Sequence, residues 1–305
     1  MKLVTFSCRG RTSIGKIVGN QVVDLCASVP GMPATMRELL AGGAVLMQRA
    51  REITAELGVT YPLADVRLEA PVPNPSKYLA IGMNYAKHAE EARRAGVQVP
   101  DSQVWFNKQV SCVNGPFDPV FMPKVSDKLD YEAELGVVIG KRCRHVAAGD
   151  ARSVIAGYLV CNDVSVRDWQ KRSATMTLGK SFNTTGPIGP WIVTDDDVPD
   201  PHALTLRMLV NGEVRQQIST GEMVFNIFEQ IAYLSTVMTL EPGDILATGT
   251  PSGIGAAMDP PSWLKIGDVM RVEIDGIGYI QNTVIPEPDA LPFAPDAPLS
   301  RLNTV

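Results

Sequence analysis

The sequence is poor in the residues that most often carry protons or form disulfides. Among its 305 residues there are only three histidines and five cysteines, and no two cysteines stand in a C-x-x-C arrangement. An odd number of scattered thiols is typical of reduced cysteines rather than of a disulfide framework. We therefore expect a cytoplasm-like, reducing compartment, and a cytoplasmic location is the simplest prediction.

Several other features are absent, and each excludes a class of protein. No apolar run approaches the ~18 residues of a membrane-spanning helix. The opening MKLVTFSCRG lacks the long apolar core of a secretory signal, so none is expected. The net charge of -5, without a basic run interleaved with aromatic residues, argues against a nucleic-acid surface. With 45% hydrophobic and 20% charged residues, the chain is predicted to be an ordinary soluble globular protein.

The chain is predicted to divide into two domains and a tail. Residues 2–25 have the pattern of a β-meander, and helical patterns follow at Thr35–Ala41 and Ala44–Leu57. Prolines at 62, 71, 73 and 75 then interrupt the chain. We therefore expect a small N-terminal α+β domain over 1–72, a larger domain over 73–285 and a Pro-rich C-terminal tail over 286–305.

Three carboxylates stand at or near the ends of predicted strands. Asp130–Gly140, DYEAELGVVIG, is predicted to be a strand, which places Glu132 and Glu134 on one face. Asp163 directly follows a second apolar strand, Gly157–Cys161. This all-oxygen set favours Mg, Mn or Ca over Zn, and it leaves coordination positions for water or substrate. The alternative is a solvated sheet edge whose charges face water.

A histidine lies in a predicted helix that begins near residue 86. His88 and Glu91 are three positions apart, so the carboxylate can orient the imidazole for proton transfer. Glu90, two positions away, is expected to face elsewhere, but the consecutive glutamates leave the partner of His88 open. The high local charge and Gly96 favour a mobile lid, and a plain surface helix is the alternative.

Polar residues that could contact a substrate follow Asp163. Arg167 and Gln170 share a short helical turn, where the guanidinium can hold a substrate carboxylate or pair with an acid. Lys180 follows Gly179 in a loop with apolar neighbours. Glycines at 249, 253 and 255 make a weak nucleotide motif, because no Gly-Lys-Ser/Thr follows them. A tight turn that brings Thr250 to a small ligand is the better interpretation.

Other residues are predicted to have structural or surface roles. Lys108, at the end of a partly apolar strand, could serve a site but is more typical of an exposed strand-end lysine. His145 and His202 are also expected to be exposed. Asn-Gly at 211–212 predicts a hairpin, and the helix that follows is expected to be capped by Ser219 or Thr220.

Taken together and in order, these segments resemble the fumarylacetoacetate hydrolase family over residues 72–285, and the short leading part resembles the smaller acylpyruvases and 2-hydroxyhepta-2,4-diene-1,7-dioate isomerase-like members. The resemblance implies an α+β, mostly β fold, a mixed β-sandwich roll with a small N-terminal accessory domain, and a homodimer. The segments that carry it are GMNYAKHAEE, DYEAELGVVIGK, NDVSVRDWQ, TLGKSFNTTGPIGP, ISTGEMVFNIFEQIAYLS and EPGDILATGTPSGIG.

The resemblance also implies roles for residues. It implies that three acids bind Mg or Mn, with Ca as an occupant in crystals, and that a His–Glu dyad on a lid activates water. Four further residues are implied to contact substrate or polarise its oxygens. The metal set is Glu132, Glu134 and Asp163; the dyad is His88 and Glu91; the others are Arg167, Gln170, Lys180 and Thr250.

The implied activity is metal-dependent hydrolysis of the carbon–carbon bond of a 2,4-dioxo acid of the acylpyruvate type, giving pyruvate and a carboxylic acid. Such an enzyme could serve aromatic catabolism. Oxaloacetate decarboxylation and isomerisation of an unsaturated 2-hydroxy-dicarboxylate are alternatives, because both pass through the same type of enolate. The expected partner is a small keto acid, with no nucleic acid and no membrane.

Overall fold

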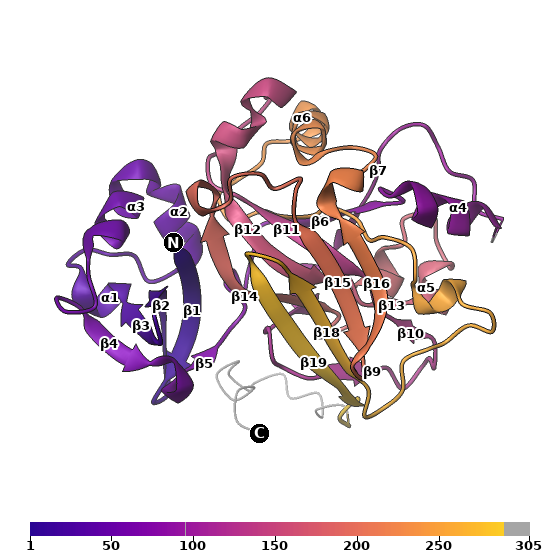
Figure 1. Cartoon of the computed structure of the whole chain (residues 1–305), viewed down its shortest axis with the longest axis horizontal. Coiled ribbons are helices and arrows are strands. Elements are labelled where there is room, and N and C mark those ends of the chain that lie inside the picture. Colours follow the sequence, from indigo (N-terminus) through magenta and orange to yellow (C-terminus); the bar gives the residue numbers. More distant parts are fainter. Residues whose placement is uncertain (95, 290–305) are drawn as a thin grey trace, which may run out of the picture.

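The computed structural model describes residues 1–94 and 96–289 and shows a mostly β protein (Figure 1). No helix in this part of the chain is long and apolar enough to cross a membrane. Ala95 and residues 290–305, which include most of the predicted Pro-rich tail, lie outside the described residues.

The first 72 residues form a strand meander with helices beside it, as the sequence predicted. A capping box begins the second helix, where the Thr35 hydroxyl accepts the N–H of Glu38 and the Glu38 carboxylate accepts the N–H of Thr35. The third helix ends at Glu52, earlier than the predicted Leu57. The elements are β1 (Lys2–Cys8), β2 (Arg11–Val18), β3 (Gln21–Asp24), α1 (Leu25–Ser28), α2 (Met36–Ala41), α3 (Gly43–Glu52), β4 (Val59–Pro62), η1 (Leu63–Asp65) and β5 (Arg67–Leu68).

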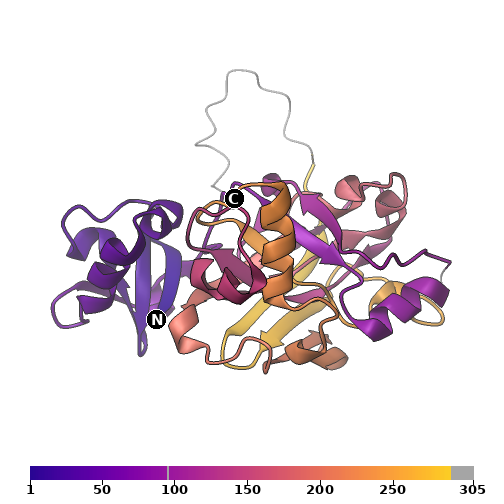
Figure 2. The same ribbon diagram turned by 90° about the horizontal axis from the view of Figure 1, so that it is seen from above.

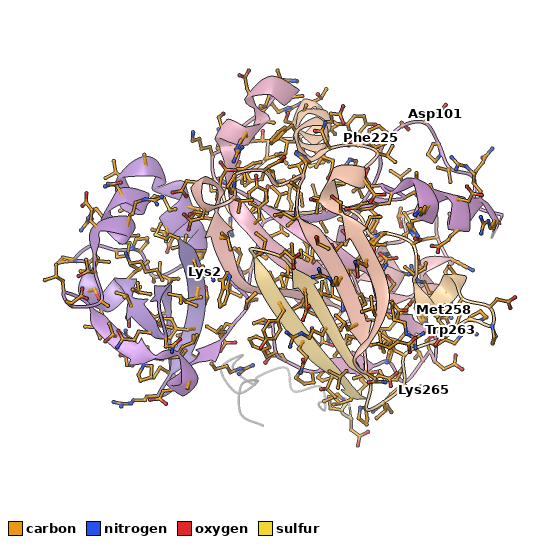
Figure 3. The ribbon with its side chains drawn as sticks, in the orientation of Figure 1. Lys2, Asp101, Phe225, Met258, Trp263 and Lys265 are labelled. Atoms are coloured by element: carbon orange, nitrogen blue, oxygen red, sulfur yellow. The ribbon has the colours of Figure 1, made fainter. Side chains whose placement is uncertain are left out.

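A large mixed sheet joins this N-terminal part to the rest of the protein. Its strand order is β4-β3-β2-β1-β14-β12-β11-β17-β6-β7, with β5 beside β1 and β8 beside β14. Lys2 of β1, labelled in Figure 3, pairs with Val193 of β14. Its ammonium lies 4.5 Å from the ring centroid of Trp191. The added strands are β6 (Tyr78–Gly82), β7 (Val104–Lys108), β8 (Val113–Asn114), β11 (Ala133–Ile139), β12 (Ile155–Asn162), β14 (Gly186–Thr194) and β17 (Ile245–Ala247). The division at residue 72 stays a prediction, and the sheet runs across it.

A five-stranded sheet, β16-β15-β18-β19-β9, packs against β11 and β12 of the large sheet. The predicted hairpin is confirmed, because Asn211 and Gly212 connect β15 and β16 with positive φ angles of 52° and 83°. The strands are β9 (Val120–Met122), β15 (Thr205–Val210), β16 (Glu213–Ser219), β18 (Val269–Ile274) and β19 (Gly278–Pro286), and a separate small pair is β10 (Leu129–Asp130) with β13 (Ser165–Val166).

The two faces of β11 have different surroundings. Leu135 and Val137 belong to the core between the two sheets, with Met208 and Val272 from the smaller sheet. Val138 belongs to a second core cluster on the other face. Side chains two apart on a strand share a face, so Glu134 points to the same side as Val138, away from the core between the sheets.

Helices cover the outside of the sheets, and α4 lies at the end far from the N-terminal strands (Figure 2). The cap predicted for α6 is wrong. Its N-cap is Asn226, whose side chain accepts the N–H groups of Phe228 and Glu229, while Thr220 begins a separate short turn. The remaining helices are α4 (Ala86–Arg94), α5 (Arg167–Gln170), α6 (Ile227–Val237), η2 (Val110–Cys112), η3 (Ala148–Val154), η4 (Thr177–Lys180), η5 (Asp195–Asp197), η6 (Thr220–Glu222) and η7 (Gly255–Ala257).

Candidate metal centre and acid–base site

Three carboxylates meet where β11 begins and β12 ends. Glu134 lies in β11, while Glu132 directly precedes it and Asp163 directly follows β12. The predicted strand from Asp130 is therefore interrupted at residues 131 and 132. Backbone pairing continues past the strand ends, because the N–H of Asp163 donates to the carbonyl of Glu132 at 2.9 Å.

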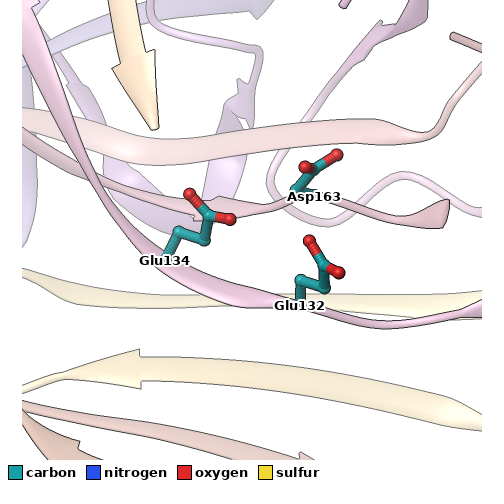
Figure 4. A group of neighbouring side chains, drawn as sticks. All are labelled: Glu132, Glu134 and Asp163. Atoms are coloured by element: carbon teal, nitrogen blue, oxygen red, sulfur yellow. The ribbon is translucent and has the colours of Figure 1, made fainter. Parts of the chain in front are cut away.

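These carboxylates point toward one another (Figure 4). One oxygen from each of Glu132, Glu134 and Asp163 lies within 4.8 Å of the others. The exposed fractions are 5%, 0% and 0%, so the alternative of a solvated sheet edge is wrong. Three buried acids at this distance repel one another strongly unless positive charge lies among them.

Two lysines neutralise part of this charge. The ammonium of Lys180 donates to Glu132 Oε2 at 2.7 Å and to Asp163 Oδ2 at 2.8 Å. Lys108 donates to the other oxygen of Asp163, Oδ1, at 2.7 Å, and to the backbone carbonyls of Val164 and Thr185. Lys108 is fully buried, so the prediction of an exposed strand-end lysine is wrong.

An arginine neutralises two further oxygens. Arg167 Nε donates to Asp130 Oδ2 at 2.8 Å, and its Nη1 lies 2.7 Å from Glu132 Oε1. Nη1 also donates to Gln170 Oε1 at 2.9 Å. Arg167 thus pairs with acids, which was one of the two predicted arrangements. Its Nη2 is buried without a hydrogen-bond partner among the described residues, so one donor remains available for an anion.

The cluster carries more buried acid than buried base. Four carboxylates, including Asp130, face the three cations Lys108, Lys180 and Arg167. Burial would raise the pKa of Glu132, but the charges of Lys180 and Arg167 outweigh it and hold that pKa below its ordinary value.

Glu134 is the acid without a cation. Its Oε2 accepts the N–H of Gly249 at 2.7 Å, and its Oε1 is buried without a partner among the described residues. Burial raises its pKa well above the ordinary value, and the carboxylates of Asp163 and Glu132 raise it further. A hard divalent cation held by the three acids would satisfy Oε1 and supply the missing charge. The residues therefore fit Mg or Mn.

The histidine on α4 pairs with the predicted glutamate. His88 Nδ1 lies 3.1 Å from Glu91 Oε2, whereas Glu90 is exposed and accepts from Arg94. Of the two consecutive glutamates, Glu91 is therefore the one in contact. The N–H of Gly253 donates to Glu91, and the same loop contacts Glu134 and Asp130, which places the dyad beside the acid cluster.

The glycine loop after β17 serves the carboxylates. The N–H of Gly249 donates to Glu134, that of Gly253 to Glu91 at 3.0 Å, and that of Gly255 to Asp130 at 2.8 Å. Gly253 has a φ of 100°, and a Cβ there would lie 2.2 Å from a backbone oxygen. The predicted tight turn is present, and it aims backbone donors at acids rather than at a phosphate.

Thr250 is buried in the same loop. Its hydroxyl accepts from Gln216 Nε2 at 2.9 Å. Gln216 in turn accepts the N–H of Ala133, the first residue of β11. The loop, β16 and β11 are thereby linked next to the acid cluster, and the contact of Thr250 with a ligand stays a prediction.

Two residues with clear contacts in the site were missed from the sequence. Asp130 is fully buried and accepts from Arg167 and from the N–H groups of Tyr131, Gly255 and Ala256. Its place in the D-x-E-x-E run was a usable signal, since alternation puts it on the face of the other acids. Lys108 had no such local signal.

The other two histidines lie elsewhere. His145 is exposed, as predicted. His202 was also expected to be exposed, which is wrong: 21% of its side chain is exposed, and its Nε2 accepts the N–H of Ile227 at 3.1 Å.

Comparisons with known proteins show which proteins this chain is similar to. The model of the fumarylacetoacetate hydrolase C-terminal family matches residues 77–285. An oxaloacetate tautomerase fahd2 of Xenopus laevis, named as mitochondrial, is 42% identical over 269 residues, covering 88% of this chain and 83% of its own. A fumarylacetoacetate hydrolase from Exiguobacterium antarcticum is 36% identical with a TM-score of 0.83, covering 94% of this chain and 100% of its own.

A second solved structure bears on the metal. The maleylpyruvate hydrolase from Sphingobium sp. SYK-6, in complex with manganese(II) and pyruvate, is 34% identical with a TM-score of 0.79, covering 94% of this chain and 100% of its own. The matched family model extends over more than half of the sequence. The chain belongs to the fumarylacetoacetate hydrolase family.

Proposed function

We propose that this enzyme is a Mg- or Mn-dependent hydrolase that cleaves the carbon–carbon bond of a 2,4-dioxo acid. The observation that carries the proposal is the His88–Glu91 pair beside an acid cluster in which Glu134 Oε1 has no hydrogen-bond partner among the described residues. Glu132, Glu134 and Asp163 would hold the cation. When bound, it supplies Lewis-acid charge at the oxygens where negative charge develops.

The dyad provides the general base. Glu91 contacts Nδ1 of His88, which favours the tautomer with its proton on Nδ1 and leaves Nε2 to accept a proton from water. The water oxygen adds to the distal carbonyl carbon. The bond between this carbon and the adjacent methylene then breaks, and its electron pair passes to the enolate of pyruvate. Protonation of the methylene carbon by the imidazolium completes pyruvate and a carboxylic acid.

The cations of the site would bind and orient the substrate. Nη2 of Arg167, which has no hydrogen-bond partner among the described residues, would donate to the substrate carboxylate. Gly179 packs against Gln170, and the neighbouring Lys180 points its ammonium at Glu132. The positive charge of Lys180 would stabilise the developing enolate. Thr250 would contact the substrate from the glycine loop.

Tautomerisation of oxaloacetate is a second candidate, favoured by the 42% identity to the Xenopus oxaloacetate tautomerase. It needs no attacking water: His88 would move a proton between the methylene carbon and the 2-oxo oxygen. Decarboxylation of oxaloacetate and isomerisation of unsaturated 2-hydroxy-dicarboxylates use the same enolate and remain alternatives to hydrolysis.

A substrate panel separates these reactions. Acylpyruvates, fumarylpyruvate, oxaloacetate and unsaturated dicarboxylates are tested with Mg²⁺ and Mn²⁺, following pyruvate release and, separately, enol absorbance. Pyruvate from acylpyruvates supports the hydrolase. Enol–keto conversion of oxaloacetate without pyruvate from any substrate rejects it in favour of the tautomerase.

Two substitutions assign the residues. Glu132→Gln is expected to lose metal binding and activity together, while His88→Ala keeps the metal and loses hydrolysis by about 10²- to 10⁴-fold, the share of general-base catalysis. The exposed His145 gives a matched control, His145→Ala, which should retain full activity. Hydrolysis at the wild-type rate in His88→Ala would reject the dyad.

Two broader expectations belong to the same proposal. We propose a homodimer, to be measured by light scattering of the full chain. We also propose a reducing, cytoplasm-like compartment; the five cysteines, all within the described residues, are free thiols, which is compatible with it.

A further inference from the structure

Asp163 is held by two lysines that approach it from different sides. Lys108 contacts Oδ1, and the backbone carbonyls of Val164 and Thr185 accept its other donors, so all three of its N–H groups have acceptors. Lys180 contacts Oδ2 and also Glu132 Oε2, so its ammonium lies between two of the three acids. The two ammonium groups therefore lie in different places: that of Lys180 contacts two acids of the metal set, whereas that of Lys108 contacts only Asp163.

The assignment of oxygens shows which atoms are left for a cation. Lys108 contacts Oδ1 of Asp163, and Arg167 contacts Oε1 of Glu132. Glu134 Oε1 has no partner among the described residues. Among the described residues, Lys180 is the group that contacts the remaining oxygens, Asp163 Oδ2 and Glu132 Oε2. A cation that binds these two oxygens would therefore compete with Lys180 and not with Lys108.

We propose that the two lysines act in opposite directions on cation binding: Lys108 is a positioning residue that fixes Asp163 with Oδ2 facing the cluster, and Lys180 holds the place of the cation and leaves the acids when it binds. This inference rests on the metal site of the proposed function. It also gives Lys180 a route to the substrate, since an ammonium displaced from Glu132 and Asp163 has donors free for a substrate oxygen.

The test is calorimetric titration of the chelator-treated full-length protein with Mn²⁺ alone, at one fixed pH. Lys108→Met should weaken Mn²⁺ binding by about 10- to 100-fold, the range for losing a group that orients a metal ligand. Lys180→Met should tighten it by about tenfold, the order expected from removing one unit charge beside a dication. Lys77→Met is the matched control, because Lys77 forms a 2.7 Å pair with the buried Asp244 rather than with a site acid.

Opposite signs are what distinguish the proposal. If both lysines acted only through charge, both variants would bind Mn²⁺ more tightly, and if both were only structural supports, both would bind it more weakly. Either pattern overturns the inference while leaving the metal site intact. Failure of the wild-type protein to bind Mn²⁺ would instead reject the metal in the proposed function.

Loss of folding need not stop the test. Circular dichroism checks each variant first. If Lys108→Met does not fold, Lys108→Leu, which also removes every donor to Asp163, takes its place with the same expected direction. Lys180→Met by itself also tests the proposed role of Lys180, since unchanged or weaker Mn²⁺ binding in that variant contradicts the place-holding role.

Discussion

Asp130 connects the arginine of the site to the glycine loop, so its removal should be costly. Its carboxylate accepts four N–H groups: those of Tyr131, Gly255 and Ala256 and the Nε of Arg167. In Asp130→Asn, the side-chain amide replaces one oxygen with a donor, which faces N–H groups that are themselves donors. The buried guanidinium also loses one of its two acids.

The expected loss follows from these contacts. Removing one partner of a buried ion pair costs about 3–5 kcal/mol when the other charge is left alone. Arg167 still has Glu132 and Gln170 as acceptors, so we expect the lower end, about 3 kcal/mol. The measurement is urea unfolding followed by circular dichroism. The exposed neighbour Asp127 provides the control, and Asp127→Asn should stay within ~0.5 kcal/mol of the wild type.

Two further measurements test the cause. Hydrogen exchange should speed up at the amides of Gly255 and Ala256, which lose their acceptor, and not throughout the protein. The double variant Asp130→Asn with Arg167→Met should cost less than the sum of the single variants, because the second change removes the charge that the first left unpaired. A loss below ~1 kcal/mol in Asp130→Asn would refute the reasoning.

Two other predictions concern His202 and the choice of dyad glutamate. Burial lowers the pKa of His202, so protonation favours the unfolded chain, and the wild type should lose stability as pH falls below about 6.5. His202→Gln keeps an acceptor for the N–H of Ile227 and should lose less between pH 7.5 and 5.5 in urea unfolding; equal losses would contradict this. Glu91→Gln should lower kcat for hydrolysis by up to ~10⁴-fold while Glu90→Gln does not; the reverse order would reassign the partner of His88.

The parts of the site that the sequence predicted are those fixed by local geometry. Alternation along β11 places Glu134 on one face, and a residue at the end of the paired β12 reaches the same point. Helical spacing brings His88 to Glu91. In the fold, the Asn211–Gly212 hairpin was predicted for the same reason, because it depends on residues next to one another in the chain.

The parts that were missed depend on distant segments. Lys108 is separated by 55 residues from Asp163 and by 77 from Thr185, whose carbonyl also accepts from it. The residues next to Lys108 in the sequence do not indicate which distant groups its side chain contacts once β7 pairs with β6. The prediction of the α6 cap failed for a different reason. Asn226 and Thr220 are both good capping residues, and only the path of the chain decides which of them begins the helix.

Charge balance offers a way past this limit. Once three acids are predicted to share one buried point, cations must lie nearby, because several uncompensated carboxylates cannot remain ionised in a protein interior. A lysine in an apolar strand is then a candidate for burial rather than for the surface, as Lys108 and its neighbour Phe106 show. Within residues 1–94 and 96–289, the same balance leaves Glu134 Oε1 without a hydrogen-bond partner. A divalent metal bound by the three acids would supply the positive charge that Glu134 needs in order to stay ionised.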